Sequence, residues 1–153
     1  MFERCFENTL GTTLREMPDG TLFMLTGDIP AMWLRDSTAQ LGPYLHFAAE
    51  DQTISDMIAA VSRRQIEYVL LDPYANAFNA APDGSGHQSD RTQQSPWIWE
   101  RKYEVDSLCY PVQLAHDLWA TTGRADHLGD SFARAARVII ELWRTEQLSL
   151  IHI

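Results

Sequence analysis

The sequence has few cysteines, few basic residues relative to acidic ones, and no long hydrophobic run. Its two cysteines, Cys5 and Cys109, are too few and too far apart for a disulfide framework. No apolar segment reaches the ~20 residues that a transmembrane helix needs, and residues 1–4 lack the apolar core of a signal peptide. The 12 Lys and Arg residues against 21 Asp and Glu residues give a formal net charge of -9, which argues against a nucleic-acid partner and an anionic membrane surface. We therefore expect a cytoplasmic protein with a neutral ligand.

The chain also lacks the common motifs for metal, phosphate or nucleophilic sites. Its histidines form no His-x-x-x-His pair, and no Cys-x-x-Cys occurs, so we expect no metal site. The segment Gly84-Ser85-Gly86 is one residue short of a Gly-x-Ser-x-Gly nucleophile elbow. No glycine-rich phosphate loop is present.

Helical periodicity dominates what the sequence does contain. With 153 residues, 45% of them hydrophobic and 22% charged, the chain has the profile of one globular domain. Apolar residues at i, i+3, i+4 spacing predict about five helices, at 2–13, 36–48, 54–70, 106–122 and 130–147. A short apolar run at 21–25 predicts a strand or part of a β-hairpin. From Pro73 to about Trp99 no period is visible, and such a long connection is usually functional or disordered.

Two of the predicted helices begin with the same dipeptide. Asp36-Ser37 opens a helix containing Pro43, and Asp106-Ser107 opens a helix containing Pro111. We expect Asp36 or Ser37 to cap the first of these, with the capping-box spacing of Ser37 to Gln40. Each is followed by a plainer amphipathic helix, which suggests a helical-hairpin repeat. Because consecutive helices alternate in direction, both dipeptides should lie at the same end of the molecule.

The residues around these dipeptides suit the binding of a sugar. Indole rings stack on the CH faces of sugars, and charged groups form directional hydrogen bonds with hydroxyls. Paired carboxylates also carry out glycoside hydrolysis, but acids beside arginine stay ionised, which suits binding better than proton donation. An alternative interpretation is purely structural, with Trp33 as a core anchor and the charges as local ion pairs. The candidate binding residues are Trp33, Arg35, Asp36, Trp99, Glu100, Arg101, Tyr103, Glu104 and Asp106.

Two long segments carry a resemblance to a known family. Residues 26–37 (TGDIPAMWLRDS) and 97–111 (WIWERKYEVDSLCYP) resemble glycoside hydrolase family 125, the metal-independent exo-α-1,6-mannosidases, and the likeness extends from about Phe2 to Arg144. The resemblance implies an (α/α)6 toroid, inverting hydrolysis of a terminal α-1,6-mannoside or N-glycan-derived oligosaccharide, and no cofactor. It also implies that Arg35 and Asp36 hold the terminal mannose in the −1 subsite, with Trp33 shaping the wall.

The chain is shorter than the family pattern. About five helices form only part of such a toroid, so residues 1–147 are predicted to be the N-terminal part of the catalytic domain. The general acid and base are expected beyond this chain, and none is assigned within it. Residues 148–153 are expected to be a non-native or run-off tail. An open arc of helices should expose inner-face residues such as Leu41, Tyr44 and Leu108.

Two other classes of function stay open. One is a helical module that binds mannosides without cleaving them. The other is a helical-hairpin scaffold, which predicts that the charged side chains pair with one another and leave no hollow between the second and fourth helices.

Overall fold

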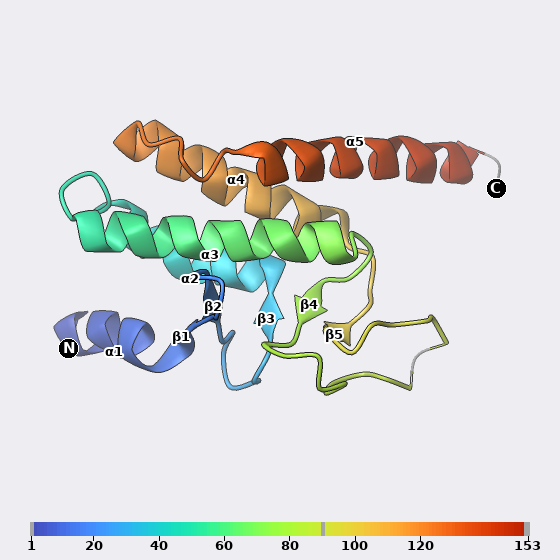
Figure 1. Ribbon diagram of the computed structural model, residues 1–153, viewed down its shortest axis with the longest axis horizontal. Coiled ribbons are helices and arrows are strands. Elements are labelled where there is room, and N and C mark those ends of the chain that lie inside the picture. Colours follow the sequence, from blue (N-terminus) through green and yellow to red (C-terminus); the bar gives the residue numbers. More distant parts are fainter. Residues whose placement is uncertain (1, 90, 152–153) are drawn as a thin grey trace.

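The computed structural model describes residues 2–89 and 91–151, and within them the chain is mainly helical (Figure 1). The helices are α1 (Phe2–Thr13), α2 (Leu34–Leu45), α3 (Gln52–Leu71), α4 (Val105–Thr122) and α5 (Asp130–Ile151). The strands are β1 (Leu14–Glu16), β2 (Leu22–Met24), β3 (Met32–Trp33), β4 (Ala77–Phe78) and β5 (Ile98–Glu100). The predictions of helices in these regions and of a small hairpin around residues 21–25 are confirmed.

The helices form two layers that alternate along the chain. Helix α2 packs against α4, whereas α3 packs against both α4 and α5, and α3 and α5 run along the long axis of the molecule (Figure 1). The alternation places the N-terminal ends of α2 and α4 together, beside the short strands β3, β4 and β5. This arrangement is the predicted partial toroid, and it brings the two dipeptide motifs to one end.

Helix α2 begins earlier than the sequence predicts. Its N-cap is Trp33, which makes no side-chain cap hydrogen bond, and Asp36 lies within the first turn. The Ser37 hydroxyl donates to the Trp33 carbonyl at 2.6 Å, so the predicted cap at Asp36 or Ser37 and the capping box are both wrong. The Leu34 N–H donates to the Asn76 carbonyl at 3.1 Å instead, because the backbone between β4 and α3 supplies the partner that a cap side chain would provide.

Two small antiparallel sheets lie in the connections between the helices. Strands β1 and β2 form a hairpin, and β4 pairs with β3 on one side and β5 on the other. Strands β4 and β5 close both ends of the long 79–97 connection, which the sequence indicates only as an aperiodic loop. At the end of this connection, Trp97 directly precedes β5 and Trp99 lies within it.

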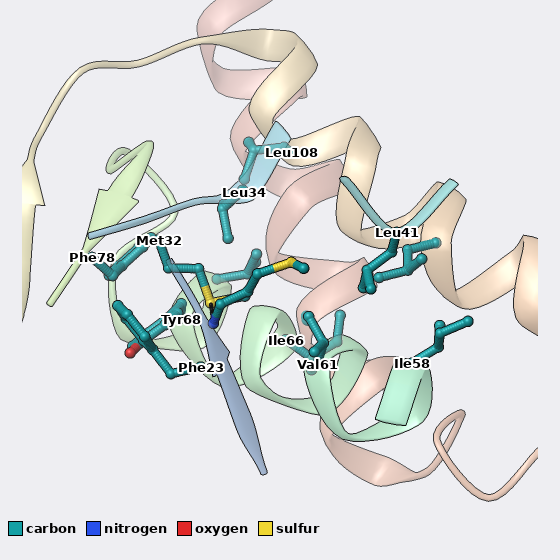
Figure 2. Close-up of a cluster of buried hydrophobic side chains, with 14 of the residues drawn as sticks. Phe23, Met32, Leu34, Leu41, Ile58, Val61, Ile66, Tyr68, Phe78 and Leu108 are labelled. Atoms are coloured by element: carbon teal, nitrogen blue, oxygen red, sulfur yellow. Dashed lines mark hydrogen bonds between the residues drawn. The ribbon is translucent and has the colours of Figure 1, made fainter. Parts of the chain in front are cut away.

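The core lies where β2, β3 and β4 meet the inner faces of α2 and α3 (Figure 2). Tyr68 stacks on Phe78 with the ring centroids 4.4 Å apart. Leu41, Tyr44 and Leu108 are only 0%, 3% and 1% exposed, so the prediction that they would be exposed is wrong. Other elements of the chain cover these residues: the Tyr44 hydroxyl donates to the Phe6 carbonyl at 2.6 Å, and α3 lies against α2 and α4.

The last helix differs in length from the prediction. Helix α5 extends to Ile151, four residues past the predicted boundary at Gln147, and residues 152–153 lie outside the described part of the chain. Among the described residues, every helix is too short or too polar to cross a bilayer.

Candidate active site

Arg35 joins the two motifs that the sequence predicts to share one end. Its Nη1 atom donates to Asp106 Oδ2 at 3.0 Å and to Glu104 Oε2 at 3.4 Å, and its Nε atom lies 3.7 Å from Asp36 Oδ2. The hydrogen bond to Asp106 raises the pKa of the Arg35 guanidinium, so the group is cationic at every accessible pH. We call Arg35, Asp36, Glu104 and Asp106 the charged corner.

Helix geometry places the charged corner. Asp36 lies in the first turn of α2 and Asp106 in the first turn of α4, where the helix dipoles favour negative charge. Glu104 is the N-cap residue of α4, and its Oε2 atom also accepts from the Ser107 hydroxyl at 3.0 Å. Glu104 and Asp106 are therefore held by the Arg35 cation and by hydrogen bonds, and such an arrangement of charged groups can bind a polyol.

Two tryptophans pack against each other, and one of them, Trp33, lies two residues before Arg35. The ring centroids of Trp33 and Trp99 are 6.5 Å apart at an interplanar angle of 60°, and both side chains are partly exposed. Trp33 ends β3 and Trp99 belongs to β5, so the shared neighbour β4 brings them together. Edge-to-face indoles that keep part of their surface in solvent can form an apolar wall for a sugar ring.

Gly86 fixes the position of Trp99 and was not identified from the sequence as a site residue. A Cβ atom at Gly86 would lie 2.4 Å from the Trp99 carbonyl oxygen and 2.8 Å from the indole Cδ2, and the φ angle of Gly86 is +98°. The neighbouring His87 N–H donates to the Trp99 carbonyl at 2.7 Å. Only glycine combines this backbone conformation with so close an approach. The Gly84-Ser85-Gly86 segment is the sequence signal that could have indicated it.

Three predicted binding residues make their described contacts away from Arg35. Glu100 Oε2 accepts from Asn76 Nδ2 at 2.7 Å. Arg101 donates to Asp72 Oδ2 at 2.7 Å, and its guanidinium lies 5.2 Å from the centroid of the Tyr74 ring.

Tyr103 belongs to the same neighbourhood as Arg101. Its ring lies 5.7 Å from that of Tyr74, and burial is the main cause that raises the pKa of its hydroxyl. The Tyr74 hydroxyl donates to Glu146 Oε1 at 2.9 Å, which ties this cluster to α5. The second motif therefore divides: Glu104 and Asp106 join Arg35, whereas Arg101 and Tyr103 connect β5 to the ends of α3 and α5.

Gln65 of α3 holds the beginning of α2, the helix that carries Arg35 and Asp36. This fully buried residue of α3 donates through Nε2 to Ser37 Oγ at 2.8 Å, Thr38 Oγ1 at 2.9 Å and the Leu34 carbonyl at 3.2 Å. These contacts fix the first turn of α2, which presents Arg35 to the second motif. A polar residue on the apolar stripe of α3 is the sequence signal for this role.

The described residues contain no cluster of side chains suited to binding a metal ion. No group of three or more His, Cys, Asp or Glu side chains in residues 2–89 and 91–151 is arranged to hold a metal ion. A cavity of about 570 Å³ lies away from the charged corner, between α3 and the start of α5, and is lined in part by Arg63, Glu67 and Asp126.

Alternating helix layers with a charged and aromatic corner at one end define the class of α/α-toroid glycosidases, and comparisons with known proteins agree. The chain superposes with a TM-score of 0.93 on a metal-independent alpha mannosidase of Streptococcus pneumoniae, solved as a non-productive substrate complex with alpha-1,6-mannobiose. The two sequences are 54% identical, and the match covers 95% of this chain and 34% of that chain. The Meiotically up-regulated gene 157 protein of Schizosaccharomyces pombe is 37% identical over 134 residues, which are 80% of this chain and 26% of that protein.

The family follows from the sequence match. Residues 1–152 match the metal-independent alpha-mannosidase family GH125, and the chain belongs to that family. It spans about a third of the solved relative and about a quarter of the fission-yeast relative.

Proposed function

We propose that residues 1–147 form the N-terminal part of the catalytic domain of an inverting exo-α-1,6-mannosidase. The substrate is a terminal α-1,6-linked mannoside, free or on an N-glycan-derived oligosaccharide, and the general acid and base come from residues outside this chain. Family membership supports the mannosidase class, and the alpha-1,6-mannobiose bound to the pneumococcal relative supports the linkage.

The bridge from Arg35 to Glu104 and Asp106 is the observation that supports the proposal, because it brings together two segments distant in sequence. Asp36 has a side chain that is 49% exposed, and its described contact with Arg35 is a long 3.7 Å. Its carboxylate can therefore accept hydrogen bonds from sugar hydroxyls while Arg35 stays in place. Hydrogen bonds to charged groups contribute about 1.5–3 kcal/mol each, so we expect these residues to contribute strongly to binding of the terminal mannose.

Trp33 forms the apolar wall of the proposed subsite. It adjoins Arg35 in sequence, and its ring is packed edge-on against Trp99, which limits its motion. A fixed indole can cover one face of a pyranose while the charged corner holds the hydroxyls on its rim.

A chimera tests this proposal. This chain replaces the matching segment of the pneumococcal mannosidase, and hydrolysis of α-1,6-mannobiose is followed by chromatography. We expect Asp36→Ala to lose most activity, whereas Glu50→Ala, an exposed acid in the turn between α2 and α3, keeps it. Near-normal hydrolysis by the Asp36→Ala chimera would remove Asp36 from the site.

The helical-hairpin scaffold is the second candidate, because the charged side chains do pair with one another. A scaffold needs no sugar, so it predicts that substitutions in the charged corner change stability and leave hydrolysis by the chimera intact. A non-catalytic mannoside-binding module predicts a third result, in which the chimera binds α-1,6-mannobiose without cleaving it.

A further inference from the structure

Asn79 is a buried polar residue at the point where β4 leads into the 79–97 connection. It directly follows Phe78, the last residue of β4, and is only 2% exposed. A buried amide needs hydrogen-bond partners, because leaving its polar atoms unpaired costs free energy. The partners of Asn79 therefore show which part of the chain this side chain holds.

The side-chain amide of Asn79 lies among three carbonyl oxygens from the two arms of that connection. Its Nδ2 atom donates to the Ser85 carbonyl at 3.0 Å on the outgoing arm and to the Pro96 carbonyl at 3.0 Å on the returning arm. The carbonyl of Ile98, in β5, lies 3.4 Å from the same nitrogen. One side chain therefore joins the start of the connection to its end and to the strand that contains Trp99.

The indole of Trp99 has no polar anchor of its own. Its N–H is buried and has no hydrogen-bond partner among the described residues. The position of the ring therefore depends on packing and on the backbone around it, including the close approach of Gly86. Asn79 holds both of these backbone segments, because Ile98 directly precedes Trp99 and Ser85 directly precedes Gly86.

We propose that Asn79 is the positioning residue for Trp99. It acts through the backbone: its amide fixes the carbonyls on both arms of the connection, and these arms set the place of the indole. The consequence for hydrolysis rests on the proposed function, in which Trp99 limits the motion of the Trp33 wall. The holding of Trp99 by Asn79 does not depend on that function, so the two can fail separately.

Two neighbouring residues provide matched controls. Gln88 donates through Nε2 to the Ile98 carbonyl at 2.7 Å and to the Ser85 carbonyl at 3.2 Å, but its own side chain is exposed. The Tyr68 hydroxyl donates to the main-chain carbonyl of Asn79 at 2.7 Å from the core (Figure 2). Gln88→Met therefore removes exposed donors to two of the same carbonyls, whereas Tyr68→Phe weakens the core and leaves the amide in place.

The emission of Trp99 is the first measurement. In the chimera with the pneumococcal mannosidase, each variant is compared with its own Trp99→Phe counterpart, and the difference between the two fluorescence spectra isolates the emission of Trp99. We expect Asn79→Leu, which keeps the branched shape and removes the donors, to shift this difference spectrum to longer wavelength and to increase its quenching by acrylamide. A ring released from its support meets more water. Gln88→Met and Tyr68→Phe should leave the difference spectrum unchanged.

Hydrolysis of α-1,6-mannobiose is the second measurement. We expect Asn79→Leu to raise KM by about tenfold while kcat changes by less than about threefold, because a wall of the subsite contributes to binding in the ground state and the transition state alike. Tyr68→Phe should lower the thermal midpoint and leave KM unchanged. If Asn79→Leu shifts the emission of Trp99 but leaves KM unchanged, Asn79 positions Trp99 and the proposed sugar wall is wrong.

Two results overturn the proposal. One is an Asn79→Leu chimera that behaves like Tyr68→Phe, with a lower thermal midpoint and an unchanged difference spectrum, because the role of the amide is then only structural. The other is failure of both Asn79→Leu and the smaller Asn79→Ala to fold while Tyr68→Phe folds, because the amide is then needed by the whole domain and not for the placement of one ring.

Discussion

Replacing Arg35 by methionine should separate a binding role from a structural one. Methionine keeps an unbranched, helix-compatible stem and removes the cation. The pair with Asp106 joins side chains that are 38% and 51% exposed, and the pair with Glu104 has one partner only 20% exposed. Exposed ion pairs contribute about 0.2–1 kcal/mol each, so the two pairs together stabilise the fold by about 0.4–2 kcal/mol.

That free energy predicts a modest thermal effect. A loss of 1 kcal/mol shifts the midpoint by about 2–4 °C in a domain of this size, so Arg35→Met should lower the midpoint by about 1–8 °C, measured by circular dichroism. Loss of the Arg35 cation should lower hydrolysis much more strongly than it lowers stability. About two charge-assisted hydrogen bonds, at about 1.5–3 kcal/mol each, correspond to a decrease of about 100-fold or more in kcat/KM of the chimera.

Arg63→Met is the matched control. Arg63 is 39% exposed and pairs with Asp126 at 3.3 Å, away from the charged corner. It should show a similarly small thermal shift and unchanged hydrolysis. If Arg35→Met hydrolyses α-1,6-mannobiose as well as Arg63→Met does, the sugar-binding role is refuted. If it lowers the midpoint by much more than 10 °C, Arg35 is a structural anchor and the reasoning from exposed ion pairs is wrong.

Three further predictions concern stability. Gln65→Met should lower the free energy of unfolding by about 1–3 kcal/mol in urea titrations, since it removes donors to three acceptors in the first turn of α2; no loss would mean that these contacts are not needed. Arg124 lowers the pKa of Asp126 to about 2, so the pair stabilises the fold above about pH 4, and this contribution is lost as pH falls toward 2. Asp126→Asn should therefore flatten the dependence of the free energy of unfolding on pH in that range. An unchanged dependence would contradict the assignment. Gly86→Ala should shift tryptophan fluorescence more than Gly84→Ala, because both have positive φ but only the Gly86 Cβ meets Trp99; equal shifts would exclude steric displacement of the ring.

The sequence predicted the helices because their apolar spacing is a local property. It also predicted that the two motifs meet at one end, since helix alternation follows from the order of elements, and the bridge from Arg35 to Asp106 confirms it. The start of α2 could not be predicted in the same way. The partner of the Leu34 N–H is the Asn76 carbonyl, 42 positions along the chain, and no local pattern signals such a contact.

The candidate site was predicted as one group of residues, but the structure divides it. Glu104 and Arg101 are close in sequence, yet Glu104 meets Arg35 whereas Arg101 meets Asp72. Which partner each takes depends on the direction of the backbone after β5, and a list of residue types does not contain that direction. Burial of Leu41 and Leu108 was missed for a similar reason, because the elements that cover them are distant in sequence.

The pairing of β4 with β5 has a consequence for the history of the family. Because the ladder holds both ends of the 79–97 connection, lengthening that connection costs only about 0.6 kcal/mol for each doubling of its length. Insertions between these strands should thus be tolerated without disturbing the helices, while the chain beside Trp99 changes in size and chemistry. We expect this connection to be the place where related enzymes diverge in the branches they accept around the terminal sugar.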